Sequence, residues 1–102
     1  MVTAHSDNTD TARVHVHVEG RVQGVGFRAF VQQSGALLGL TGWARNIGYD
    51  KVEAVAEGPR AVLDEFVEAI RTGPRGSRVD EIKIEWEMVL NEFDRFEVRS
   101  SR

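Results

Sequence analysis

The stretch RVHVHVEGRVQGVGFRAF, residues 13–30, joins two structural patterns through a glycine-rich segment. In its first part valines alternate with polar residues, which predicts a strand over 13–19 with one buried and one exposed face. From Phe27 the apolar residues recur at helical spacing instead, and Gly39 is a suitable end for that helix. Residues 20–26 lie between the two and predict a loop, in which three glycines let the backbone turn freely.

The rest of the chain continues with strands and one further helix. Two short strands lie at hairpin distance, and an amphipathic helix follows the second of them. Gly58-Pro59 opens this helix, because proline is well tolerated at the first helical position, and Gly73-Pro74 ends it. The remaining strands are predicted, in chain order, over residues 40–46, 52–57, 82–88 and 95–99.

The predicted order is strand–helix–strand–strand–helix–strand, with one more strand at the end. This order is the split βαβ, ferredoxin-like plan of an α+β protein, an antiparallel sheet with two helices on one face. The alternating strands favour this plan, because a parallel sheet covered on both faces would show continuous apolar runs. In the terminal strand we expect Phe96 and Val98 to point inward.

Length and composition narrow the function classes. A chain of 102 residues is expected to form one domain, here over 13–102, after a polar segment, 1–12, that we interpret as a disordered leader. The absence of cysteine excludes disulfides, thiolate nucleophiles and Cys-ligated metals. A net charge of −3 argues against nucleic acid as a partner, and no apolar run is long enough to span a membrane. These features predict a cytoplasmic protein.

Positive charge is concentrated near the glycine-rich loop. Residues 11–46 contain four arginines and one acid, Glu19, although the whole chain is acidic. A helix that begins after this loop presents unpaired N–H donors and a partial positive charge, which favour an anion. Arg28, in the first turn, could add a forked contact to phosphate oxygens. The loop therefore predicts a phosphate site, although a tight turn with a surface arginine would give the same pattern.

Two common phosphate-binding motifs do not account for the loop. The P-loop requires Gly-Lys followed by Ser or Thr, which this sequence lacks. The segment from Gly24 to Ala29 fits the looser dinucleotide pattern G-x-G-x-x-A. That pattern belongs to a much larger doubly wound domain with an acidic residue after the second strand, and neither feature is present.

The loop GRVQGVGFR, residues 20–28, together with GWARN, residues 42–46, resembles the acylphosphatase family. The resemblance extends from about Val14 to Arg99 and includes the order of the elements. It implies an enzyme that hydrolyses the carboxyl–phosphate bond of acyl phosphates, with no metal, no cofactor and no covalent intermediate. Carried over by motif position, the catalytic residues are Arg28 and Asn46. The phosphate cradle is implied on the backbone of Arg21, Val22, Gln23, Gly24 and Val25.

Neither motif contains a strong general base, because Asn46 carries an amide. We therefore expect Asn46 to orient a water for in-line attack on phosphorus and the substrate's own phosphoryl oxygen to take the proton. A non-catalytic anion-binding module on the same fold is an alternative. An RNA-binding sheet is a poorer one, since the first strand offers His15 and His17 where exposed aromatics would be needed.

Other residues receive structural interpretations. His15 and His17 share one strand face that a metal could use, but a solvent-facing pair is the simpler interpretation. Trp43 is interpreted as a sheet aromatic that could border the site, and Arg45 as a residue on the face opposite Asn46. We expect no metal site, a small-molecule acyl phosphate as the partner, and a monomer.

Overall fold

The computed structural model of the protein describes residues 10–102. Its elements are, in chain order, β1 (Thr11–Arg21), α2 (Phe27–Leu37), β2 (Thr41–Ile47), β3 (Lys51–Pro59), α3 (Arg60–Thr72), β4 (Arg78–Glu87) and β5 (Phe96–Val98). The predicted order of elements is confirmed. Since β1 begins at Thr11, the last two residues of the expected leader belong to a strand, while residues 1–9 lie outside the described part of the chain.

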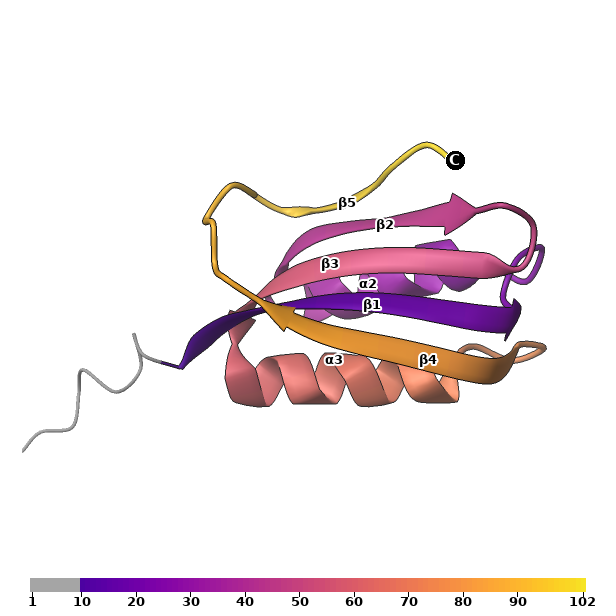
Figure 1. Ribbon diagram of the computed structural model, residues 1–102, viewed down its shortest axis with the longest axis horizontal. Coiled ribbons are helices and arrows are strands. Elements are labelled where there is room, and N and C mark those ends of the chain that lie inside the picture. Colours follow the sequence, from indigo (N-terminus) through magenta and orange to yellow (C-terminus); the bar gives the residue numbers. More distant parts are fainter. Residues whose placement is uncertain (1–9) are drawn as a thin grey trace, which may run out of the picture.

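The five strands form one sheet in the order β4-β1-β3-β2-β5, with both helices on the same face (Figure 1). The β1–β3, β1–β4 and β2–β3 pairs are antiparallel, as expected for the ferredoxin-like fold. The pairing of β5 with β2 is parallel, so the sheet is mixed rather than wholly antiparallel. β5 runs in this direction because the chain leaves β4 at one end of the sheet and crosses to the opposite edge before it pairs (Figure 1).

The core lies between the sheet and the two helices. Alternate residues of β1 supply its centre, and Val14 and Val16 have no exposed surface. Phe27 from α2 and Phe66 from α3 pack against them. Phe96 of β5 joins this core, but Val98 is 47% exposed, so the expectation that both would point inward is wrong for Val98. Val98 is the last residue of β5, which forms the outer edge of the sheet.

The sheet face opposite the helices carries charged side chains that are unusually well buried. Arg13, Glu53 and Glu57 are all less than a tenth exposed. Arg13 Nη1 lies 3.0 Å from Glu57 Oε2, and its Nε lies 3.1 Å from Glu87 Oε1, so one guanidinium bridges β3 and β4. Ion pairs of this kind let the sheet bury charge on a face that no helix covers. Within residues 10–102, no helix is long and apolar enough to cross a membrane.

Candidate active site

A shallow cavity of about 190 Å³ lies where the β1–α2 loop meets the end of β2. Three elements contribute to it: the loop, the first turn of α2 and one residue of β2. Its lining consists of Val22, Gln23, Gly24, Gly26, Phe27, Arg28, Ala29 and Asn46. Arg28 and Asn46, which are 18 positions apart in the sequence, are therefore brought to one place, as the motifs predicted.

The backbone of the loop requires glycine at two positions. Gly24 has φ 78° and Gly26, the residue that precedes α2, has φ 75°, a region that other residues rarely adopt. A side chain at either position would meet nothing within 4 Å, so the requirement comes from the backbone angle and not from lack of space. Among the described residues, no side chain caps the start of α2. Its first N–H groups thus remain available to an anion.

Arg28 is partly buried and held from one side. Its Nη1 donates to the carbonyl oxygen of Arg99 at 3.1 Å and to Ser101 Oγ at 3.2 Å. The segment 99–102 reaches this position by continuing along β2, with hydrogen bonds from Arg99 N to Ala44 O and from Arg102 N to Asn46 O. The sequence motifs gave no sign of this contact, because the C-terminal residues lie outside both of them.

Asn46 points toward the helix side of the sheet at the end of β2. It pairs with Val52, whose side chain is fully buried in the core. Its Oδ1 atom is buried and has no hydrogen-bond partner anywhere in residues 10–102. A buried amide oxygen without a partner costs free energy, which binding a polar ligand at this point would recover.

The residues of β2 that alternate with Asn46 lie on the sheet face away from the helices. Arg45 Nε donates to Glu53 Oε1 at 2.7 Å, as expected for a residue that alternates with Asn46. Trp43 is stacked under the guanidinium groups of Arg45 and Arg99, at 4.9 and 4.7 Å from the ring centroid. Trp43 is therefore a sheet aromatic, and it does not line the cavity.

Gln23 has a structural role that the sequence left open. Its side-chain Nε2 donates to the carbonyl oxygens of Ile47, Gly48 and Lys51 at 3.1, 3.2 and 2.9 Å. These carbonyls belong to the β2–β3 hairpin, so the side chain ties the loop to that hairpin. Only the backbone of Gln23 is then free to face a ligand.

The remaining cradle residues differ in position. Val22 and Gly24 line the cavity, whereas Arg21 ends β1 and Val25 packs partly buried against the core. Gly26, Phe27 and Ala29 also line the cavity, although the sequence analysis did not assign them as site residues. The lining contains no histidine, aspartate or glutamate. The cavity can hold an oxyanion and orient a water, but it offers no strong base.

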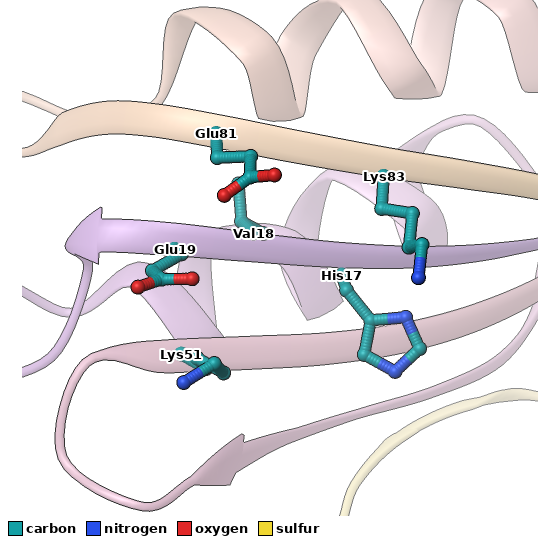
Figure 2. A pocket seen from close by; sticks show the side chains of 6 residues that line it. All are labelled: His17, Val18, Glu19, Lys51, Glu81 and Lys83. Atoms are coloured by element: carbon teal, nitrogen blue, oxygen red, sulfur yellow. The ribbon is translucent and has the colours of Figure 1, made fainter.

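A second and larger cavity, of about 270 Å³, lies on the other side of the molecule (Figure 2). Its lining residues come from β1, β3 and β4, and its charged side chains lie on the sheet face away from the helices. They are His17, Val18, Glu19, Lys51, Glu81 and Lys83. Because acids and lysines are balanced there, this cavity lacks the cationic character that an acyl phosphate would need.

The chain is similar to known proteins in both sequence and structure. Residues 14–98 match the family model described as Acylphosphatase. The chain is 52% identical over 87 residues to the acylphosphatase of Syntrophotalea carbinolica, which covers 85% of this chain and 95% of that protein. The crystal structure of an acylphosphatase from Bacillus subtilis superposes with a TM-score of 0.82 at 40% identity, over 86% of this chain and 98% of the other. An acylphosphatase from Coxiella burnetii gives 0.84 at 34% identity, over 91% and 97%.

Proposed function

Because this chain belongs to the acylphosphatase family and hydrolyses the carboxyl–phosphate bond of small acyl phosphates, we propose that the cavity at the β1–α2 loop is its active site. The observation that carries this proposal is the meeting of Arg28, Asn46 and the loop backbone around one cavity. A non-catalytic anion-binding role, the alternative considered from the sequence, would leave the position of Asn46 unexplained.

The phosphoryl group is held by the loop and Arg28. Backbone N–H groups of residues 21–25 donate to the phosphoryl oxygens, and the Arg28 guanidinium adds a charged, forked contact. To make that contact, Arg28 exchanges its hydrogen bonds to Arg99 and Ser101 for bonds to the substrate. Donors fixed in this way act most strongly on charge that develops in the transition state.

Asn46 positions the attacking water. Its unpartnered Oδ1 accepts a hydrogen bond from that water and directs the water oxygen at phosphorus, in line with the leaving carboxylate. The new oxygen–phosphorus bond forms as the bond from phosphorus to the acyl oxygen breaks. The water proton passes to a phosphoryl oxygen of the substrate, because no residue that lines the cavity is a strong base. The step needs neither a metal nor a cofactor, and we propose that the protein acts as a cytoplasmic monomer.

The test is hydrolysis of benzoyl phosphate by the purified full chain with EDTA present, with Arg28→Ala and Asn46→Ala alongside. We expect each variant to lose about 100- to 1000-fold in kcat, a loss of the size seen when one oriented hydrogen-bonding group is removed from an active site. Asn46→Ala should leave the inhibition constant of inorganic phosphate almost unchanged, whereas Arg28→Ala should raise it. Arg28→Lys should recover little, because the lysine point charge cannot form a fork.

Two control variants remove the same chemical groups away from the cavity. Arg75→Ala removes an exposed arginine and Gln33→Ala an exposed amide, and both should keep full turnover. Near-normal turnover of Asn46→Ala would contradict the water-orienting role. Wild-type protein that binds phosphate at the loop but fails to turn over would instead support the anion-binding module.

A further inference from the structure

Three potential metal-ligating side chains converge on the sheet face that the helices leave uncovered. His15 and His17 come from β1, and Glu53 comes from β3, where it pairs with His17. One ligand atom from each lies within 4.8 Å of the other two. His15 Nε2 is 2.6 Å and His17 Nε2 is 3.4 Å from the same carboxylate oxygen, Glu53 Oε2. The two histidines are therefore not simply exposed to solvent, as the sequence suggested.

The surroundings of His15 hold its ring in one orientation. Its Nδ1 lies 3.0 Å from Glu87 Oε2, while its Nε2 faces Glu53. A neutral imidazole has one ring proton and can donate to only one of these carboxylates. When Nδ1 donates to Glu87, the lone pair of Nε2 faces the carboxylate of Glu53. A cation between them, either a second proton or a metal ion, satisfies both groups in that tautomer.

Two arginines orient the carboxylates. Arg45 Nε lies 2.7 Å from Glu53 Oε1, which leaves Oε2 to the histidines. Arg13 Nε donates to Glu87 Oε1 in the same way, which leaves Glu87 Oε2 to His15. Each carboxylate therefore presents one fixed oxygen to the histidines.

The cluster is open to solvent on one side. His17 borders the cavity of about 270 Å³ in Figure 2, and its side chain is 36% exposed. Glu19 and Glu81 line the same cavity together with Lys51 and Lys83, so its charges are balanced and do not bar a cation from entering. An ion therefore has a route to the cluster that requires no opening of the sheet.

We propose that His15, His17 and Glu53 form a binding site for Zn²⁺, with water as the fourth ligand. Two imidazoles and one carboxylate are a common ligand set for this ion, and Glu87 would act as the carboxylate that orients a ligating histidine. Zinc bonds of about 2.1 Å at tetrahedral angles hold the donor atoms about 3.4 Å apart. The His17–Glu53 distance already has this value, and the His15–Glu53 distance has to widen as the metal replaces the shared proton.

The zinc site is separate from the cavity that contains Arg28 and Asn46. Arg45, which orients Glu53, faces away from its neighbour Asn46, so the two sites lie on opposite faces of the sheet. The inference therefore does not depend on the proposed catalytic roles. Bound zinc would stabilise the fold by mass action, and acyl phosphate hydrolysis would continue with the metal removed.

The experiment is a titration of the full chain with Zn²⁺. Binding is measured by calorimetry, and the melting temperature is measured at each zinc concentration. We expect one ion to bind per chain and the melting temperature to rise with zinc concentration. His17→Ala and Glu53→Gln should each weaken binding by at least about tenfold and abolish the rise, since loss of even an outer-shell partner typically costs 10- to 100-fold. Glu53→Gln also removes a buried ion pair and could fail to fold for that reason. In that case the zinc affinity of His17→Ala, which changes a partly exposed side chain, is the test.

Controls separate this cluster from other ligands. Glu81→Gln makes the same charge change on the same sheet face and should leave zinc affinity unchanged. His5→Ala removes the third histidine of the chain and should also bind normally. A wild-type chain that shows no saturable zinc binding would overturn the proposal. So would binding that survives His17→Ala but is lost in His5→Ala, or in Glu85→Gln, which disrupts a neighbouring group formed with His15 and Glu87.

Discussion

Gln23 shows how a side chain without a chemical role can set the geometry of a site. Its amide nitrogen is shared among three carbonyl groups of the β2–β3 hairpin, from which β2 also presents Asn46. The phosphate-binding loop and the water-positioning residue are thereby fixed relative to each other. Gln23 is a positioning residue, since it acts through the backbone it holds.

We therefore expect Gln23→Ala to weaken phosphate binding. Loss of a hydrogen bond worth about 0.5–1.5 kcal/mol corresponds to about a 2- to 10-fold increase in the inhibition constant of inorganic phosphate. The increase should be accompanied by a smaller fall in kcat, measured with benzoyl phosphate. Gln33→Ala, on the exposed side of α2, is the matched control. A lower melting temperature with an unchanged inhibition constant of inorganic phosphate would contradict a positioning role.

At the residue scale, the sequence located the segments that meet at the cavity, while their roles there stay predictions. The glycine-rich loop and Asn46 each lie at a junction of elements that local periodicity reveals, and both line the cavity. The contact between Arg28 and the segment 99–102 was not foreseen. It depends on β5 pairing in parallel with β2, and no local pattern specifies that pairing.

The packing of α2 on β5 depends on one glycine. Gly35 is buried in the last turn of α2, and a Cβ added there would overlap the ring of Phe96. Glycine in a helix costs up to about 1 kcal/mol relative to alanine, so its presence here is explained by the close approach of the ring. The helix gives up local stability to let Phe96 enter the core.

Gly35→Ala should consequently destabilise the protein despite alanine's better helix propensity. We expect a loss of about 1–3 kcal/mol in the free energy of unfolding, the usual cost of overpacking, measured by urea denaturation. Combining it with Phe96→Leu should cost less than the sum of the two single changes, because the smaller side chain relieves the overlap. An additive pair would contradict the steric explanation.

Element-scale prediction was accurate for types and less so for ends. Both helices were expected from their apolar stripes and their flanking glycines, and both were found. β4 begins at Arg78 rather than at residue 82, because its first residues pair with Gly20 and Arg21 beyond a register shift in β1. Pairing with a distant strand extends a strand past its own alternating pattern.

Across the whole molecule, Arg13 joins segments that are far apart in the chain. Its guanidinium contacts Glu57 of β3, Glu87 of β4 and Glu92 of the segment that leads to β5. Glu57 also accepts hydrogen bonds from the backbone N–H groups of Leu90 and Asn91, at 2.8 and 3.1 Å. This network closes the end of the sheet from which the chain crosses to the other edge.

Removal of Arg13 should have a large effect on stability and a small one on activity. Arg13→Ala leaves the buried Glu57 carboxylate without its cation, and breaking such a pair costs on the order of 3 kcal/mol, measured by urea denaturation. Turnover of the folded variant should be unchanged, because Arg13 does not line the catalytic cavity. Arg71→Ala, which breaks only an exposed pair on α3, should cost less than about 1 kcal/mol. Equal losses in the two variants would contradict the role of the network.

The position of β1 between two later strands has a consequence for how the protein is made. This strand leaves the ribosome before both of its neighbours, residues 51–59 and 78–87, and its Arg13 pairs with a glutamate 74 positions later. The sheet cannot close until residue 87 has left the exit tunnel. Contacts of such long range slow folding, so the nascent β1 remains unpaired through most of translation. Its alternating histidines and charges keep one face of that waiting strand hydrophilic, which protects the nascent chain against premature association.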